Sequence, residues 1–459
     1  MTTSNPHRPS LFDGSISRRR RRGAVLAVLA AGVVVAGATP AVADGYTTEF
    51  VNVNTAGQKA DAKTSRFPSV SETGLIVAFD SDGTNLAGGD TNGLRDVFVR
   101  YRGVPMTIRA SVSTSGTQGN GDSGHPALST FAERVAFESS ASNLVSGDTN
   151  GVGDIFVRNL YSPQSTDRVS VSSTGVQANG VSGAASISAD ARDVTFSSVA
   201  SNLVPGDTNG EGDVFVRDVI AGTTTRVSVS STGAQGNGQS FQSSTNGRYV
   251  AFVSSASNLV PGDTNGVNDV FVRDLVAGTT IRVSLTEAGG QANGNSDAPS
   301  MSPDGILVAF ASDATNLVTG DTNHAKDVFT RQLPSHLTTR ASVSSSGEQA
   351  NGPSFSPSMG NAIDAGGIVA FVSSATNLVS GDTNRIDDVF RRDTSEPVTG
   401  RAPTERWSVA TGGSQATGGT VTGQPAMVNN GQAIAFVSNA ANLAPGDSLL
   451  TQDVFLRFP

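Results

Sequence analysis

Several residue types are absent or scarce in this sequence. Its 459 residues include no cysteine, one tryptophan and four histidines. Without cysteine the chain can form no disulfides, thiolate metal sites or cysteine nucleophile. It also shows no helix-period pattern of apolar residues, so we expect no amphipathic helices. Phosphate-loop, dinucleotide-binding and Gly-x-Ser-x-Gly motifs are missing too, which removes the enzyme classes that depend on them.

The N-terminal segment has the features of an export signal. Residues 18–22 are consecutive arginines, and residues 24–36 are small and apolar. Residues 41–43 read Ala-Val-Ala, the pattern of a signal-peptide cleavage site, and the apolar stretch is too short to span a membrane. We therefore expect residues 1–43 to be a signal peptide, used by the Sec or the twin-arginine route. Residues 44–459 should then be secreted or periplasmic, without a membrane anchor.

Acidic residues outnumber basic ones. The formal net charge of the whole chain is -9. Residues 1–43 hold six arginines and one aspartate, so residues 44–459 carry a formal charge of -14. Nucleic acid and anionic membrane surfaces are negatively charged, so an acidic chain is poorly suited to bind either. The charge suits cation binding or solubility, and we expect a monomer with neither nucleic acid nor membrane as partner.

A unit of 56 to 65 residues occurs seven times in the sequence. In each unit one phenylalanine follows a Val-x or Ile-x pair, and a second follows Asp-Val or Asp-Ile. The first set is Phe79, Phe137, Phe196, Phe252, Phe310, Phe371 and Phe436, and the second set is Phe98, Phe156, Phe215, Phe271, Phe329, Phe390 and Phe455. Together these positions take 14 of the 21 phenylalanines, as expected for two core positions in each unit.

Each unit contains four short segments with the patterning of β-strands. In the fifth unit we expect strand A at residues 299–302, a turn at 303–305 and strand B at 307–311. Strand C is the Asp-Val-Phe-Val-Arg run, and strand D is typified by residues 226–230. Four-stranded units at this spacing predict an all-β protein, a single seven-bladed β-propeller of antiparallel blades spanning residues 44–459.

The two ends of the repeat array predict how the ring closes. The last unit stops after its strand C, at residues 453–457, and has no strand D. Residues 47–53 match strand D, and Gly57 and Gln58 match the loop that follows strand D in other units. We therefore expect the N-terminal strand to complete the last blade, which would pair both open sheet edges.

The repeat also resembles a known family. Residues 302–312 read Ser-Pro-Asp-Gly-Ile-Leu-Val-Ala-Phe-Ala-Ser, and residues 269–274 read Asp-Val-Phe-Val-Arg-Asp. These motifs are similar to the TolB-like, or WD40-like PD40, β-propeller repeat of secreted bacterial proteins, and the resemblance covers residues 47–459. It implies the propeller fold, whereas the family hosts many functions. TolB itself resembles a six-bladed propeller preceded by a small α/β domain, whereas this sequence has seven repeats and no such domain.

The loops between strands B and C carry the most specific chemical pattern, Asp-x-Asn-Gly-x-x-Asp. Its oxygen-bearing residues are Asp90, Asn92, Asp96, Asp148, Asn150, Asp154, Asp207, Asn209, Asp213, Asp263, Asn265, Asp269, Asp321, Asn323, Asp327, Asp382, Asn384 and Asp388. Units five and six lack the glycine, and unit seven keeps only Asp447 and Asp453. Oxygen ligands at this spacing resemble the start of a calcium loop, so Ca²⁺ is a candidate cofactor. The same residue types often hydrogen-bond their own backbone, so a purely structural turn is the competing hypothesis.

The strand directions predict a working face. Strands B and D run in the same direction, so the B–C and D–A loops emerge together, and they are longer than the turns opposite. Long loops on a rigid scaffold commonly carry binding sites. The D–A loops repeat Gln-x-Asn-Gly, as at residues 235–238, and these amides are candidates to line a polar face or to satisfy loop backbone. Arginines at the end of strand C, such as Arg158 and Arg391, and in strand D, such as Arg282, are expected to pair with nearby aspartates.

We expect a non-catalytic binding or scaffold protein that engages a protein, peptide or cell-envelope glycan through the B–C/D–A loop face. The alternative is a propeller enzyme, a metal-dependent hydrolase, lactonase or lyase, that acts at the central channel. The sequence shows no catalytic pair outside the repeat, so binding is favoured. Residues 121–126 resemble the nucleophile segment of trypsin-like proteases, but residues 294–299 have the same register, and the repeat explains both.

Overall fold

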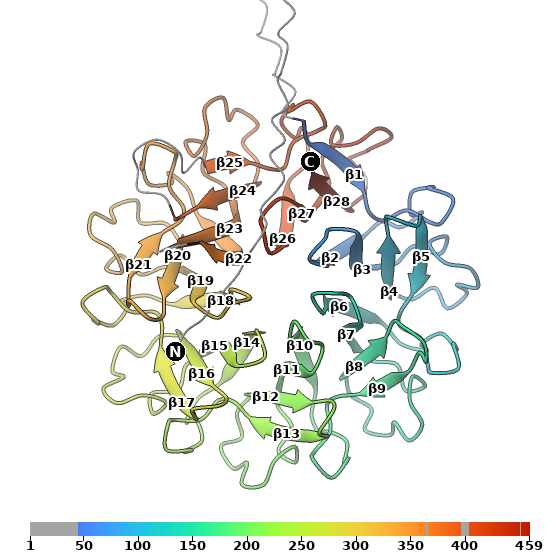
Figure 1. Ribbon diagram of the computed structural model, residues 1–459, viewed down its shortest axis with the longest axis horizontal. Helices are drawn as coiled ribbons and strands as arrows, with labels where there is room; N and C mark the ends of the chain where they lie inside the picture. The colour runs from blue at the N-terminus through green and yellow to red at the C-terminus, as the bar shows by residue number, and fades with distance from the viewer. Residues whose placement is uncertain (1–44, 364–365, 396–403, 450) are drawn as a thin grey trace, which may run out of the picture. The chain divides into compact units, whose positions relative to one another are not determined.

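The computed structural model describes residues 45–363, 366–395, 404–449 and 451–459 (Figure 1). The predicted signal peptide, residues 1–43, lies outside these described residues. Every regular element in the described part is a β-strand, in agreement with the absence of helix-period patterning. Across the described ranges, no helical segment has the length and apolar character needed to cross a membrane.

The described residues form 28 strands in seven sheets of four. In chain order they are β1 Thr47–Phe50, β2 Ser65–Val70, β3 Ile76–Ser81, β4 Asp96–Tyr101, β5 Met106–Arg109, β6 Ser123–Leu128, β7 Arg134–Ser139, β8 Asp154–Asn159, β9 Thr166–Arg168, β10 Ser182–Ile187, β11 Asp193–Ser198, β12 Asp213–Asp218, β13 Thr223–Arg226, β14 Ser240–Thr245, β15 Tyr249–Ser254, β16 Asp269–Asp274, β17 Thr279–Arg282, β18 Ser296–Met301, β19 Leu307–Ser312, β20 Asp327–Gln332, β21 Thr338–Arg340, β22 Ser354–Ile363, β23 Gly366–Ser373, β24 Asp388–Asp393, β25 Thr404–Arg406, β26 Val421–Met427, β27 Ile434–Ser438 and β28 Asp453–Phe458.

The seven antiparallel sheets follow one another around a ring, as the repeat predicts (Figure 1). Blades one to six are β2–β5, β6–β9, β10–β13, β14–β17, β18–β21 and β22–β25, and blade seven combines β26, β27 and β28 with β1. Strand A of each blade lies innermost in the ring. β1 pairs antiparallel with β28, with Thr47 opposite Phe458 and Phe50 opposite Phe455. The predicted closure by the N-terminal strand is therefore confirmed.

The two repeated phenylalanines form the centre of each blade. Phe252 of strand B lies opposite Phe271 of strand C, and their stacked rings have centroids 5.8 Å apart. Both side chains are fully buried. On the other face of the strand, Val253 packs in one cluster with Val308 and Phe310 of the next blade. Phe252 and Phe271 pack in their turn with Val214 and Val216 of the preceding blade. Burying a phenylalanine contributes roughly 1.5–3 kcal/mol, so the repeated pairs stabilise both the blades and the contacts between them.

Strand-C arginines join neighbouring blades. Arg158 of β8 donates to Ser113 O at 3.0 Å, a carbonyl in the loop that leaves blade one. It also donates to Thr166 Oγ1 at 3.1 Å, and this hydroxyl donates in turn to Val112 O at 2.5 Å. The expected pairing of the strand-C arginines with aspartates is therefore wrong. Buried backbone carbonyls need donors, and the arginine supplies them across the blade interface.

The same contact occurs in the last two blades. In blade six it is made by Arg392, which donates to Ser344 O at 3.1 Å, and not by Arg391 as expected. Strand β24 has two arginines in succession, and Arg392 is the one in register with Arg158. In blade seven Arg457 donates to Thr48 Oγ1 at 3.0 Å, and the Thr48 hydroxyl donates to a carbonyl of the loop leaving blade six at 2.6 Å. The N-terminal strand thus takes the place of strand D in this contact as well.

Strand D ends earlier than expected. We predicted it at residues 226–230, whereas β13 ends at the first residue of that range. Beyond it, Val227 N donates to Val214 O at 2.7 Å, and Ser228 Oγ donates to Asp213 Oδ1 at 2.5 Å. These bonds draw the chain under strand C, where Val227 is fully buried. The alternating apolar residues that suggested a longer strand lie in this inward turn.

Candidate functional site

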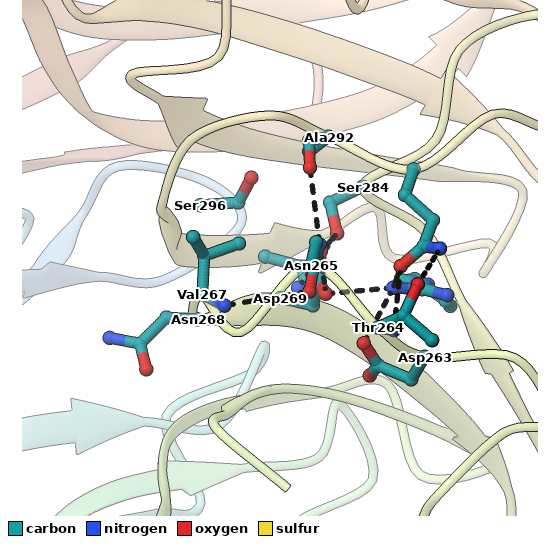
Figure 2. A network of polar contacts seen from close by, with 12 residues as sticks. Asp263, Thr264, Asn265, Val267, Asn268, Asp269, Ser284, Ala292 and Ser296 are labelled. Carbon is teal, nitrogen blue, oxygen red and sulfur yellow. Dashed lines mark hydrogen bonds and ion pairs between the residues drawn. The ribbon is translucent and has the colours of Figure 1, made fainter. Parts of the chain in front are cut away.

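Figure 2 shows the loop network of blade four, which contains the predicted residues Asp263, Asn265 and Asp269. The first two lie in the loop between β15 and β16, and Asp269 is the first residue of β16. Asn265 accepts the Val267 N–H through Oδ1 at 3.4 Å and donates Nδ2 to Asp269 Oδ2 at 2.9 Å. Its Nδ2 also donates to Ala292 O at 3.1 Å. The asparagine therefore closes its own turn and ties the B–C loop to the D–A loop.

Arg282 lies between the two carboxylates of this loop. Its Nη1 is 3.1 Å from Asp263 Oδ1 and 2.9 Å from Asp269 Oδ2. The other oxygen of Asp269, Oδ1, accepts a hydrogen bond from Ser284 Oγ at 2.5 Å. Burial raises the pKa of Asp263, and the Arg282 guanidinium opposes that shift. The side chains of Arg282 and Asp269 are 6% and 1% exposed, so the ion pair is shielded from solvent.

The same arrangement occurs in blades one to six, and it brings together all the predicted site residues of each loop. In every case the strand-D arginine lies within 2.9–3.6 Å of two aspartates, as expected; these arginines are Arg109, Arg168, Arg226, Arg282, Arg340 and Arg406. In blade seven Lys59 replaces the arginine, and its Nζ is 2.7 Å from Asp453 Oδ2.

These contacts bear on the calcium hypothesis. Asn265 turns its amide nitrogen toward Asp269, and a guanidinium fills the space between the two aspartates. A calcium site needs six to eight oxygens directed at one point. Within the part of the chain that the structure describes, no group of three or more Asp, Glu, His or Cys residues is arranged to hold a metal. The geometry is that of a hydrogen-bonded turn with a buried ion pair, and calcium binding stays a prediction.

The repeated amides of the D–A loops connect one long loop to another. In blade four Gln291 Nε2 donates to Thr264 Oγ1 at 3.0 Å. Asn293 N donates to Asn316 Oδ1 at 3.0 Å, and Asn293 Nδ2 donates to Thr315 Oγ1 at 2.9 Å, both in blade five. The two sets of long loops therefore share one face, as the strand directions predict. Their repeated polar side chains are engaged within the propeller.

Strand A from each of the seven blades contributes to the lining of a central cavity of about 580 Å³. Each of these strands contains a β-bulge, so it extends further than predicted, and β18 begins at Ser296 instead of Pro299. The residue at the bulge has a positive φ in every blade; the seven are Phe67, His125, Ala184, Gln242, Ala298, Ser356 and Gly423. A left-handed conformation costs a non-glycine residue roughly 1–2 kcal/mol, and such residues cluster at functional sites.

One side of this channel departs from the repeat. His125 Nδ1 lies 3.2 Å from Glu138 Oε2, and the His125 ring packs on Phe67 with centroids 3.8 Å apart. Asp80 Oδ2 accepts the His125 backbone N–H at 3.3 Å, and Glu138 Oε1 accepts the Ala184 N–H at 2.6 Å. Each carboxylate therefore supports the bulge of the following blade, and Glu138 also orients the imidazole.

Two arginines of blade one adjoin this cluster. The Nε atoms of Arg66 and Arg95 are 3.6 and 3.9 Å from Asp80 Oδ1. Complete burial raises the pKa of Asp80, and the two guanidinium groups oppose the shift. For His125, desolvation lowers the pKa, but the hydrogen bond and the charge of Glu138 outweigh desolvation, so the pKa is raised. The cluster therefore favours the protonated imidazole.

This cluster was not predicted from the sequence, because residues 121–126, which include His125, match the register of the repeat. A signal was present. The residue after the strand-B phenylalanine is Asp80 in blade one and Glu138 in blade two, whereas the other blades have Ser, Val or Ala there. These carboxylates and His125 form a titratable cluster outside the repeat, at one side of the channel, and the expectation that no catalytic pair departs from the repeat stays a prediction.

Comparison with known proteins adds evidence on the fold. No protein-family model matches this sequence, and no curated protein matches it. The β-propeller domain of the Trilobed protease from Pyrococcus furiosus has a TM-score of 0.50 at 8% identity, over 87% of this chain and 94% of that chain. An oligogalacturonate lyase in complex with manganese has a TM-score of 0.49 at 10% identity, over 90% of each chain. A putative TolB from Agrobacterium tumefaciens has a TM-score of 0.37 at 14% identity, over 77% of this chain and 94% of that chain.

The chain is a β-propeller. TolB proteins are among the solved structures similar to it. At these identities the similarity shows the fold alone, so the function of this propeller has to be argued from its own site.

Proposed function

We propose that this protein is an exported binding propeller that takes a protein segment, a peptide or a cell-envelope glycan at the loop-face mouth of its channel. A contrast between repeated and single groups supports the proposal. The repeated Asp, Asn, Gln and Arg side chains are engaged within the propeller, whereas Phe67 and His125 occur at one blade each and line the cavity. A ligand without seven-fold symmetry is best recognised by groups that are not repeated. Export rests on the composition of residues 1–43.

The position of the cluster supports a site on the loop face. Ser65 begins β2 and pairs with Ser81, which ends β3 just before the B–C loop. Phe67 follows two residues later, at the loop end of the channel. The lining is also held rigidly, since Ser69 Oγ accepts the Leu128 N–H at 2.9 Å and joins β2 to β6. A lining that is ordered before the ligand arrives reduces the entropy lost on binding.

Catalysis in the same channel is a second candidate function. The enzyme would be a metal-dependent hydrolase, lactonase or lyase. The pairing of His125 with Glu138 favours it, because a histidine oriented by a carboxylate is a common general acid or base. Binding is the first proposal because Glu138 also accepts the Ala184 N–H and so supports the bulge of blade three, which is a structural role.

Peptide and glycan arrays, read with and without calcium, test the proposal. Ala184→Trp places a large side chain at an exposed bulge position of the channel, and Ala221→Trp places the same side chain on an exposed turn of the opposite face. We expect array binding to be lost in A184W and kept in A221W. Binding that persists in A184W would show that the site lies outside the channel. Turnover in a hydrolase and lyase panel that disappears in His125→Ala would favour the enzyme.

A further inference from the structure

Two arginines beside Asp80 keep side-chain donors that other arginines of the propeller have used. The side chains of Arg66 and Arg95 donate no hydrogen bond to any residue that the structure describes, and their Nε atoms are 3.6 and 3.9 Å from Asp80 Oδ1. Their side chains are 28% and 35% exposed. By contrast, Arg158 and Arg282 are buried and bonded to carbonyls or carboxylates. The Nη groups of Arg66 and Arg95 are therefore available to a ligand.

The carboxylates of the same cluster are already engaged. Asp80 is fully buried and accepts a backbone N–H. Glu138 accepts the Ala184 N–H through one oxygen and faces His125 Nδ1 with the other. The His125 side chain is 48% exposed and faces Glu138 through Nδ1, so Nε2 is a further donor when the imidazole is protonated. A ligand at this side of the mouth thus meets mainly hydrogen-bond donors.

We propose that the mouth recognises a carboxylate on a compact ring-bearing molecule, held by Arg66, Arg95 and His125 Nε2, with its ring against Phe67. This inference rests on the proposed function, because it names the chemical group that the binding propeller takes. The planar guanidinium matches the geometry of a carboxylate. Phe67 lines the cavity beside Arg66, whose guanidinium carbon is 5.4 Å from the ring centroid.

Charge and size narrow the ligand class. Two guanidinium groups, and the imidazole when it is protonated, face two carboxylates, Asp80 and Glu138, so the net charge of the cluster lies between zero and about +1. That charge matches a monoanion better than a phosphate dianion. In blade five, Lys326 pairs with Asp297 at 2.5 Å and with Asp313 at 3.4 Å, so it offers no free positive charge to an anion. The cavity of about 580 Å³ lies within the range of small-molecule sites, roughly 300–1,000 Å³.

NMR titrations of the purified protein with matched pairs of small molecules test this inference. Benzoate is compared with benzamide, and glucuronate with glucose, so that each pair differs in the carboxylate. We expect the carboxylate of at least one pair to bind about ten-fold or more tightly than its neutral partner, since charge-assisted hydrogen bonds are the stronger ones. A preference confined to the first pair indicates an aromatic acid, and one confined to the second indicates a sugar acid; both support the inference.

Variants locate the carboxylate site. Arg66→Gln and Arg95→Gln should each weaken carboxylate binding about ten-fold, because each removes a charged donor. Arg385→Gln, at an exposed loop position of blade six, is the matched control and should leave it unchanged. No carboxylate preference in either pair, or tighter binding of phenyl phosphate than of benzoate, overturns the inference. The comparison of ligands tests the carboxylate preference on the wild-type protein alone. The proposed function is tested separately, by the loss of array binding in A184W.

Discussion

Neutralising Asp269 in blade four should destabilise the propeller strongly. Asp269 Oδ2 and Arg282 Nη1 are 2.9 Å apart and almost inaccessible to solvent. At an effective dielectric constant of about 20, charges at that distance attract by about 6 kcal/mol, and desolvation offsets part of this attraction. Removing one partner of a buried pair costs about 3–5 kcal/mol when the other charge is left uncompensated, and Asp263, 3.1 Å from Arg282 Nη1, compensates part of that charge. We therefore expect Asp269→Asn to lower the free energy of unfolding by up to about 3–5 kcal/mol.

A double-mutant cycle with Arg282→Met measures the interaction itself. Urea unfolding, followed by the fluorescence of the buried Trp407, gives the stability of the wild type, both single variants and D269N/R282M. The double variant should be less destabilised than the sum of the single ones, by about 2–3 kcal/mol. Asp167→Asn, on the exposed side of β9, is a control expected to change little. A coupling energy below about 0.5 kcal/mol would refute the buried ion pair.

Thermal melting of the same proteins tests the calcium hypothesis. If the loops are hydrogen-bonded turns, EDTA and excess calcium leave the melting temperature of the wild type unchanged. A melting temperature that calcium raises in the wild type but not in D269N would show that the carboxylates bind the metal. That result would replace the turn with the calcium loop.

Three further predictions concern closure, core and pH. Thr48→Val removes the hydroxyl that joins β1 to the loop leaving blade six at 2.6 Å, and urea unfolding should show a loss of about 1–3 kcal/mol. Phe252→Ala should cost about 3–5 kcal/mol, whereas Phe131→Ala, at a side chain 63% exposed, should change stability little. Burial, with Asp218 nearby, raises the pKa of Asp193 from 3.8 to about 6, so its contribution to stability is lost as pH rises through that interval. Asp193→Asn should therefore melt higher than the wild type above pH 6 and alike near pH 4, and an advantage that does not vary with pH would contradict the assignment.

Local pattern was sufficient for the strands of each blade, because strand pairing acts within one repeat. Phe252 and Phe271 are close in sequence, each stands in a short apolar run, and the two lie opposite one another on paired strands. The pairing of Arg282 with loop aspartates was likewise predictable, since strand C connects the loop to strand D. Arg158 was not predictable in this way, because its carbonyl partner, Ser113 O, lies in the loop that leaves the preceding blade and cannot be read from its own repeat.

The sequence by itself therefore determined the number of blades, their phenylalanine pairs and the closure of the ring, because repetition and strand patterning are properties of the chain read along its length. Only the tertiary structure brought Phe67, Asp80, His125 and Glu138 to one side of the channel. They come from different strands in two blades, and the bulge that turns Phe67 and His125 has no distinct sequence signature. Convergence of this kind depends on how the sheets are arranged around the axis, and no local pattern records it.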